Sequence, residues 1–152
     1  MLRRAALARA KFLEDHLNAE DHDLILQMGT RPGFVRVVGP VTLAWRRHAV
    51  SETRDSASSF SGALRLLRRE KLGAYPGGSK RARERHRILA RHIRPAALRC
   101  LREGELTLGR ELYFASFGWN LELGHWRYIL AFPIFMMLTV LRRVITRGPR
   151  SS

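Results

Sequence analysis

The sequence is poor in cysteine, in acidic residues and in long apolar runs. Its one cysteine, Cys100, excludes an intramolecular disulfide framework and fits a reducing compartment. Cys100 lies in an apolar helical pattern with Ala97 and Leu101, which predicts a buried, inert thiol. Only 13 Asp and Glu residues oppose 28 Lys and Arg residues, for a formal net charge of +15. This surplus predicts an acidic partner: anionic lipid, nucleic acid or a phosphate-bearing substrate.

Motifs that bind nucleotides or nucleic acids are also missing from the sequence. It has no G-x-G-x-x-G and no Walker A motif, and the glycines of GAYPGG (73–78) predict a turn between helices. No helix-turn-helix, zinc-ligand spacing or RNP-like motif accompanies the basic segment, and Tyr75 is the only aromatic residue between Arg65 and Arg110. The first residues, MLRRAALARAKF, lack the apolar core of a secretory signal. Because these motifs are absent, we expect an anionic membrane surface as the partner rather than nucleic acid.

Positive charge and apolar residues follow one another in the second half of the chain. Residues 65–110 hold fourteen Lys and Arg against four Asp and Glu. Residues 128–141 carry no charge, are flanked by Arg127, Arg142 and Arg143, and are shorter than the ~20 residues of a spanning helix. Aromatic residues of a membrane-interface type precede this run: Trp119, Trp126 and Tyr128. We therefore expect an interfacial helix on an anionic membrane; a buried core helix is the alternative.

The pattern of apolar and turn residues predicts an α+β fold that is mainly helical. We expect three units: residues 1–50, a basic helical extension over 51–124, and an apolar helix with a basic tail over 125–152. Within the first unit, a hairpin is predicted from two apolar strands, 34–38 and 41–45, that flank Gly39-Pro40. Helices are expected at about 2–13, 20–28, 60–72, 79–92, 95–102, 105–123 and from 124 onwards.

Two adjacent carboxylates, Glu20 and Asp21, open the predicted helix over 20–28. A helix N-terminus favours negative charge, and one of these groups could act as a general base toward a bound hydroxyl. The alternative is that Glu20, Asp21 and Asp23 simply cap a surface helix. Spacing alone favours this second interpretation, because acidic first turns are common.

The surroundings of the pair carry a family resemblance. The segments AEDHDLILQMG and FVRVVGPVTLAWRRH resemble the end of the catalytic domain in family 2 glycosyltransferases. Those enzymes share an acidic ED ahead of an apolar helix, an apolar hairpin, and an aromatic-Arg-x-His ending. The segments RREKLGAYPGG and IRPAALRCLREG, with residues 112–132, are similar to the C-terminal tail of bacterial members that act on cell-surface polysaccharides. The resemblance covers residues 2–141.

The resemblance implies the remnant of a GT-A α/β domain and roles for particular residues. Asp21 would be the general base of an inverting transfer, with Glu20 beside it. His48 would lie near the diphosphate of the nucleotide-sugar donor and near a Mn or Mg ion, as a metal ligand; a surface histidine at a strand end is the alternative. Arg46 and Arg47 could clamp the diphosphate, although alternation along a strand points only one of them inward. The partners would be a nucleotide sugar and a glycan acceptor.

Members of the family also carry an Asp-x-Asp motif earlier in the chain, which this sequence does not match. Its one Asp-x-Asp is Asp21-His22-Asp23, and this overlaps the ED pair. We therefore expect the C-terminal part of an enzyme that is inactive alone. A nucleotide-binding half, in the same polypeptide or in a separate N-terminal chain, would complete it. We expect it in the cytoplasm, peripheral at the inner face of the membrane. A non-catalytic, basic membrane-binding module and a basic nucleic-acid-binding protein are the alternatives.

Overall fold

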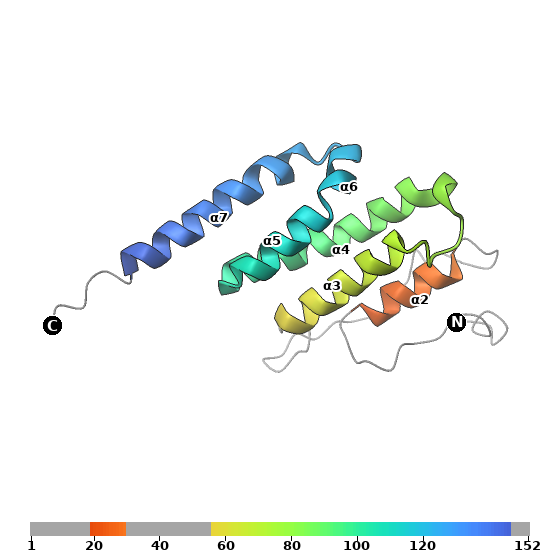
Figure 1. The fold of residues 1–152 in the computed structure, drawn as a ribbon, viewed down its shortest axis with the longest axis horizontal. Helices are drawn as coiled ribbons and strands as arrows, with labels where there is room; N and C mark the ends of the chain where they lie inside the picture. The colour runs from red at the N-terminus through yellow and green to blue at the C-terminus, as the bar shows by residue number, and fades with distance from the viewer. Residues whose placement is uncertain (1–18, 30–55, 147–152) are drawn as a thin grey trace, which may run out of the picture.

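The computed structural model describes residues 19–29 and 56–146 of the chain, and these are mainly helical. Figure 1 shows their elements, which are α2 (Glu20–Met28), α3 (Ser56–Lys71), the 3-10 helix η2 (Ser79–Arg81), α4 (Ala82–Glu103), α5 (Leu106–Ala115), α6 (Phe117–Glu122) and α7 (Trp126–Thr146). For these residues the prediction of a mainly helical fold is confirmed, whereas they do not test the α+β part of the prediction. The predicted hairpin over 34–45, the helix over 2–13, and Arg46, Arg47 and His48 lie outside the described residues.

The core is built around α4, which contacts α3, α5, α6 and α7. Its buried residues Leu89, Ile93, Ala97 and Leu101 recur at every fourth position and are at most 1% exposed. This spacing places them along one side of the helix. Other elements add large buried side chains to the same cluster: Leu66 and Leu67 from α3, Leu112 from α5, and Phe132 from α7. Cys100, also on α4, is fully buried as predicted, and its burial raises the pKa of the thiol.

The predicted helix break before Pro95 is wrong, because α4 continues through it from residue 82 to residue 103. A proline inside a helix removes one backbone hydrogen bond and costs about 3 kcal/mol. Pro95 is exposed, so the carbonyl it leaves unpaired can face water. The buried residues Ile93 and Ala97 on either side keep their packing, which compensates for the lost bond.

The predicted helix over 105–123 is divided in two at Ser116. The Ser116 hydroxyl donates to the carbonyl of Leu112 at 2.7 Å, and the Asn120 amide donates to the carbonyl of Ser116 at 2.9 Å. Both side chains are fully buried, so these bonds satisfy polar groups that would otherwise be costly. Serine that bonds back to a helix carbonyl commonly bends the chain, which explains the separation of α5 from α6.

The first half of α7 is held against α5 by aromatic contacts. The rings of Tyr113 and Phe132 stack with centroids 4.4 Å apart and planes 7° apart. The Tyr113 hydroxyl also donates to the carbonyl of Ile129 at 2.9 Å. In Figure 1 the helix lies at the opposite side of the molecule from α2 and runs in the same direction as α4.

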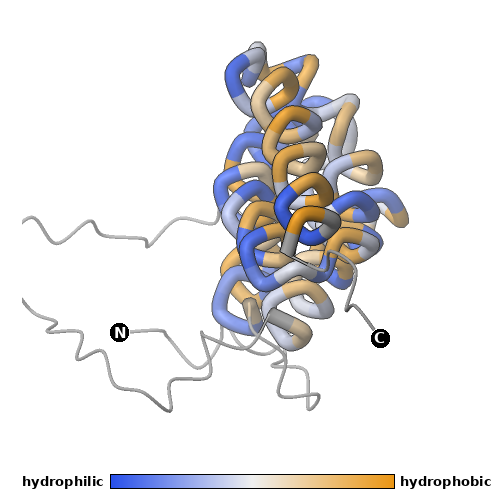
Figure 2. The backbone as a smooth tube through the Cα atoms, turned by 90° about the vertical axis from the view of Figure 1, so that its left-hand side faces the viewer, coloured by the Kyte–Doolittle hydropathy of each residue, from blue (hydrophilic) through white to orange (hydrophobic). Residues whose placement is uncertain are grey.

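The outward side of α7 is apolar and exposed. Its exposed apolar stripe consists of Trp126, Leu130, Ile134, Met137, Leu138, Val140, Leu141 and Ile145. Figure 2 views the molecule from the C-terminal end of α7 and shows hydrophobic and hydrophilic residues alternating along the helices. Among residues 19–29 and 56–146, none of the helices is both long and apolar enough to span a bilayer. The helix thus contributes one side to the core, as the core-helix alternative predicts, and leaves its other side exposed.

Candidate functional site

The predicted carboxylate pair lies on the first turn of α2, directly after a strained residue. Ala19 adopts a left-handed conformation (φ 98°), which costs an L-residue other than glycine about 1–2 kcal/mol. Its carbonyl accepts the amide N–H of Asp23 at 2.9 Å, and no side-chain hydrogen bond caps this helix within the described residues. The chain therefore turns sharply into α2, and Glu20 and Asp21 follow at its positive end.

Asp21 is an accessible carboxylate. Its side chain is 73% exposed, and one oxygen accepts the His22 backbone N–H at 2.8 Å and contacts the His22 ring nitrogen Nδ1 at 2.9 Å. Partial burial raises the pKa of Asp21, but the bonds from His22 outweigh it and hold the pKa below its usual value. The group is ionised at neutral pH and able to accept a proton from a hydroxyl placed against it.

A second imidazole lies beside this pair. The rings of His22 on α2 and His92 on α4 are 4.6 Å apart, centroid to centroid, and tilted by 40°. Burial, and to a smaller extent the neighbouring His22, lower the pKa of His92 to about 4, against the opposing effect of Asp21. His92 is therefore neutral at pH 7, and it packs α2 against α4 at the site. Within the described residues no group of three or more His, Cys, Asp or Glu is arranged to hold a metal ion.

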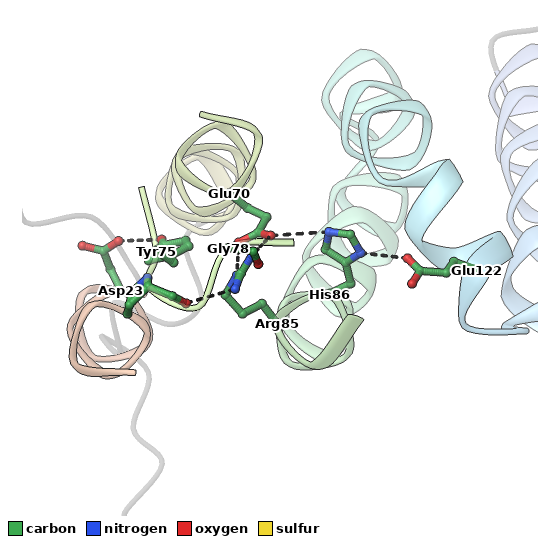
Figure 3. Close-up of polar contacts among 8 residues, drawn as sticks. Asp23, Glu70, Tyr75, Gly78, Arg85, His86 and Glu122 are labelled. Atoms are coloured by element: carbon green, nitrogen blue, oxygen red, sulfur yellow. Dashed lines mark hydrogen bonds and ion pairs between the residues drawn. The ribbon is translucent and has the colours of Figure 1, made fainter. Parts of the chain in front are cut away.

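Asp23 has a different role from Asp21, because it is 1% exposed. One of its oxygens accepts the Tyr75 hydroxyl at 2.6 Å and lies 3.1 Å from Arg69 Nε, and the other accepts the Gln27 amide at 2.7 Å. Figure 3 shows Asp23 reaching from α2 to Tyr75 in the turn after α3. The interpretation of Asp23 as a surface cap is wrong: it is a buried group that attaches α2 to the rest of the molecule.

The turn that carries Tyr75 is fixed by a second buried ion pair. Arg85 on α4 binds Glu70 on α3 through two nitrogens, at 2.7 and 3.0 Å. The same guanidinium donates to the carbonyls of Pro76 (3.0 Å) and Gly78 (2.9 Å). GAYPGG is thus the predicted turn between helices, and Arg85 determines its shape.

This network continues from Glu70 toward α6, as Figure 3 shows. His86 lies 3.5 Å from Glu70 and 2.8 Å from Glu122, and its ring stacks on Trp119 with centroids 4.5 Å apart. Polar contacts therefore connect α3 through α4 to α6, with the buried Arg85–Glu70 ion pair at one end and the exposed His86–Glu122 contact at the other. Some cations of the basic segment are structural rather than part of a solvated face.

The structure brings together only part of the predicted site. Glu20 and Asp21 are adjacent on α2, and His22 and His92, which the sequence did not single out, join them. The predicted ligands of diphosphate and metal, Arg46, Arg47 and His48, lie outside the described residues, so their roles stay predictions. Comparisons with models of protein families, with curated proteins and with solved structures find no match to this chain.

Proposed function

We propose that this chain is the C-terminal part of a nucleotide-sugar-dependent family 2 glycosyltransferase that acts in cell-surface polysaccharide or glycoconjugate synthesis. The observation that carries the proposal is the exposed, ionised carboxylate of Asp21 on a helix that Asp23 attaches firmly to the protein. The resemblance of AEDHDLILQMG and of the RRH segment to that family supports it. On this proposal α2 and the predicted hairpin over 34–45 are the remnant of a GT-A domain.

In the proposed reaction Asp21 accepts the proton of the acceptor hydroxyl while that oxygen attacks the anomeric carbon of the donor sugar. The bond from this carbon to the diphosphate breaks, and the configuration at the carbon inverts. Arg46 or Arg47 would bind the leaving diphosphate, and His48 would be a ligand of Mn or Mg, as the resemblance implies. A metal ion supplied with the donor would neutralise the charge that develops on the diphosphate. The nucleotide-binding half belongs to a longer polypeptide or to a separate N-terminal chain.

Replacing Asp21 by Asn tests the assigned base. In the native complex, with its full complement of chains, D21N should lower sugar transfer about 10²- to 10⁴-fold, because general base catalysis contributes this much. The measurement is incorporation of radiolabelled sugar from a panel of nucleotide sugars into membrane-extracted acceptor. Glu111→Gln, at an exposed glutamate on α5, is the matched control and should transfer normally. Wild-type rates for folded D21N would remove Asp21 from the mechanism.

Peripheral attachment to an anionic membrane is a second proposed property, and it stands without catalysis if the enzyme proposal fails. The exposed apolar stripe of α7 supports it, since contiguous apolar surface flanked by Arg127, Arg142 and Arg143 suits the headgroup region. The proposed location is the cytoplasmic side of the membrane, at its inner face.

Charge placed in the stripe should weaken this attachment. Ile134 is 56% exposed, so Ile134→Glu should leave the fold intact and reduce binding to vesicles containing phosphatidylglycerol about tenfold or more. Leu72→Glu adds the same charge at an 83% exposed leucine outside the stripe and is the control. Equal binding by the two variants, measured by flotation, would argue that the basic segment alone attracts the vesicles. Tight binding to duplex DNA with a steep salt dependence, and none to vesicles, would favour the nucleic-acid alternative.

A further inference from the structure

A groove of about 460 Å³ lies between α4 and α7, on the surface that neither the carboxylate site nor the buried ion pairs use. Its lining includes Arg91, Arg94 and Leu98 from α4 and Arg127, Tyr128 and Phe132 from α7. The groove is therefore formed by cationic and apolar side chains, without an acidic residue among those that line it.

Charge and apolar surface are separated along the groove because α4 and α7 run in the same direction (Figure 1). The Arg94 guanidinium lies 6.0 Å from the ring centroid of Tyr128 near the start of α7, and Arg143 near its end donates to the carbonyl of Gly104. The arginines lie at the first end of this shared surface, and Leu98 and Phe132 lie further along both helices. This order matches a molecule with an anionic head and an apolar chain.

The cations at the first end lack acidic partners within the structure. Among residues 19–29 and 56–146, no Asp or Glu forms an ion pair with Arg91, Arg94 or Arg127. The positive charge of arginines in this region also affects the neighbouring His125: burial lowers the pKa of His125, and Arg94 and Arg87 lower it further. Uncompensated arginines that converge at one place favour a phosphate group.

Tyr128 provides an independent observation. The residue is only 8% exposed, it lines the groove, and its buried hydroxyl makes no hydrogen bond with any part of the chain that the structure describes. A buried polar group of this kind normally has a partner, and its absence commonly marks a functional position. Arg94 lies over the ring of this same residue, so a ligand held by the arginines would lie against Tyr128.

We propose that the groove binds one molecule of an anionic phospholipid, with its phosphate against Arg91, Arg94 and Arg127 and close to the Tyr128 hydroxyl. One acyl chain lies along Leu98 and Phe132. The inference rests on the proposed membrane attachment, because the exposed stripe of α7 would bring the groove to the bilayer surface. The lipid site goes beyond membrane attachment, because it is a single, saturable site and not a diffuse attraction between the basic chain and an anionic surface.

The probe is dihexanoyl phosphatidylglycerol, used below its critical micelle concentration and titrated into the full chain by isothermal calorimetry. We expect saturable binding with one site per chain, and at least tenfold weaker binding for Arg91→Gln/Arg94→Gln. Arg83→Gln/Arg110→Gln removes the same charge from exposed positions outside the groove, and its affinity should stay within twofold of the wild type. Equal weakening in both double variants, or equal binding of dihexanoyl phosphatidylcholine, would overturn the site.

A tyrosine pair separates lipid binding from folding. Tyr128→Phe removes a hydroxyl that has no hydrogen-bond partner among the described residues, so it should leave the melting temperature unchanged or raised and yet weaken lipid binding. Tyr113→Phe removes a hydroxyl bonded to the carbonyl of Ile129, so it should lower the melting temperature and keep lipid affinity. Unchanged affinity in Tyr128→Phe would remove the hydroxyl from the site.

Failure of this inference is distinguishable from failure of membrane attachment. If the short-chain lipid shows no saturable binding while the chain still floats with anionic vesicles in an Ile134-dependent manner, the groove is not a lipid site and the attachment stands. If flotation also fails, both proposals are overturned.

Discussion

The attachment of α2 depends on the hydrogen bond from Tyr75 to Asp23, and its removal gives a sharp prediction. Tyr75→Phe deletes one hydroxyl and leaves the ring in place. The bond is 2.6 Å long and joins a buried donor to a buried carboxylate, in residues that are 52 positions apart in the sequence. Bonds to charged groups contribute about 1.5–3 kcal/mol. Gln27 and Arg69 still contact Asp23 in the variant, so we expect a loss of about 2 kcal/mol.

The assay is urea unfolding of the wild type, Tyr75→Phe, Asp23→Asn and the double variant. A double-mutant cycle isolates the coupling between the two side chains, which should be at least about 1 kcal/mol. Amide hydrogen exchange in α2 should accelerate selectively, since this bond holds the helix to the turn after α3. A loss below about 0.5 kcal/mol, or additive effects in the cycle, would refute the assignment of Asp23 as the attachment point.

Two further predictions follow from single residues. Burial and His22 hold the pKa of His92 near 4 in the folded chain, so as the pH falls the unfolded chain binds a proton at this residue first. The free energy of unfolding should therefore fall by up to about 3 kcal/mol as the pH drops from 6.5 toward 4. Urea unfolding of His92→Gln should show a free energy of unfolding that depends less on pH in that window. An identical profile would contradict a buried neutral imidazole. Gly104→Ala should lower the free energy of unfolding by about 1–2 kcal/mol, because Gly104 has φ +88° and a Cβ there would overlap the Arg143 guanidinium. Gly118 has open space around the position of a Cβ, so Gly118→Ala should leave the thermal stability unchanged or raise it. Equal effects of the two substitutions would contradict that packing.

The sequence predicted those features that depend on local pattern. The acidic start of α2, the turn at GAYPGG, the buried Cys100 and the separate apolar helix α7 all follow from residue type and period. Each of these patterns lies within a few consecutive residues, so it can be interpreted without knowing the tertiary structure. Asp21 could be singled out for the same reason, because it belongs to a motif that is contiguous in sequence.

The missed features depend on partners that are distant in sequence. Nothing local distinguishes Asp23 from Asp21, and only the position of Tyr75 shows which of the two is buried. Arg85 is one cation among fourteen in its segment, and its burial follows from Glu70 on another helix. Pro95 was expected to end a helix, but the packing of Ile93 and Ala97 outweighed its local preference. A weak signal existed for Tyr75, as the sole aromatic residue in a basic segment.

The most direct test of the central claim is the mass of the native species that carries this chain in its own cell, after purification through an antibody to α7. The account predicts a nucleotide-binding half in that species, either in one polypeptide heavier than the 17.5 kDa of this chain or as a second bound chain. That species should transfer sugar in an Asp21-dependent manner. A species of 17.5 kDa that purifies alone, floats with anionic vesicles and transfers no sugar would contradict the glycosyltransferase proposal and leave membrane attachment as the function.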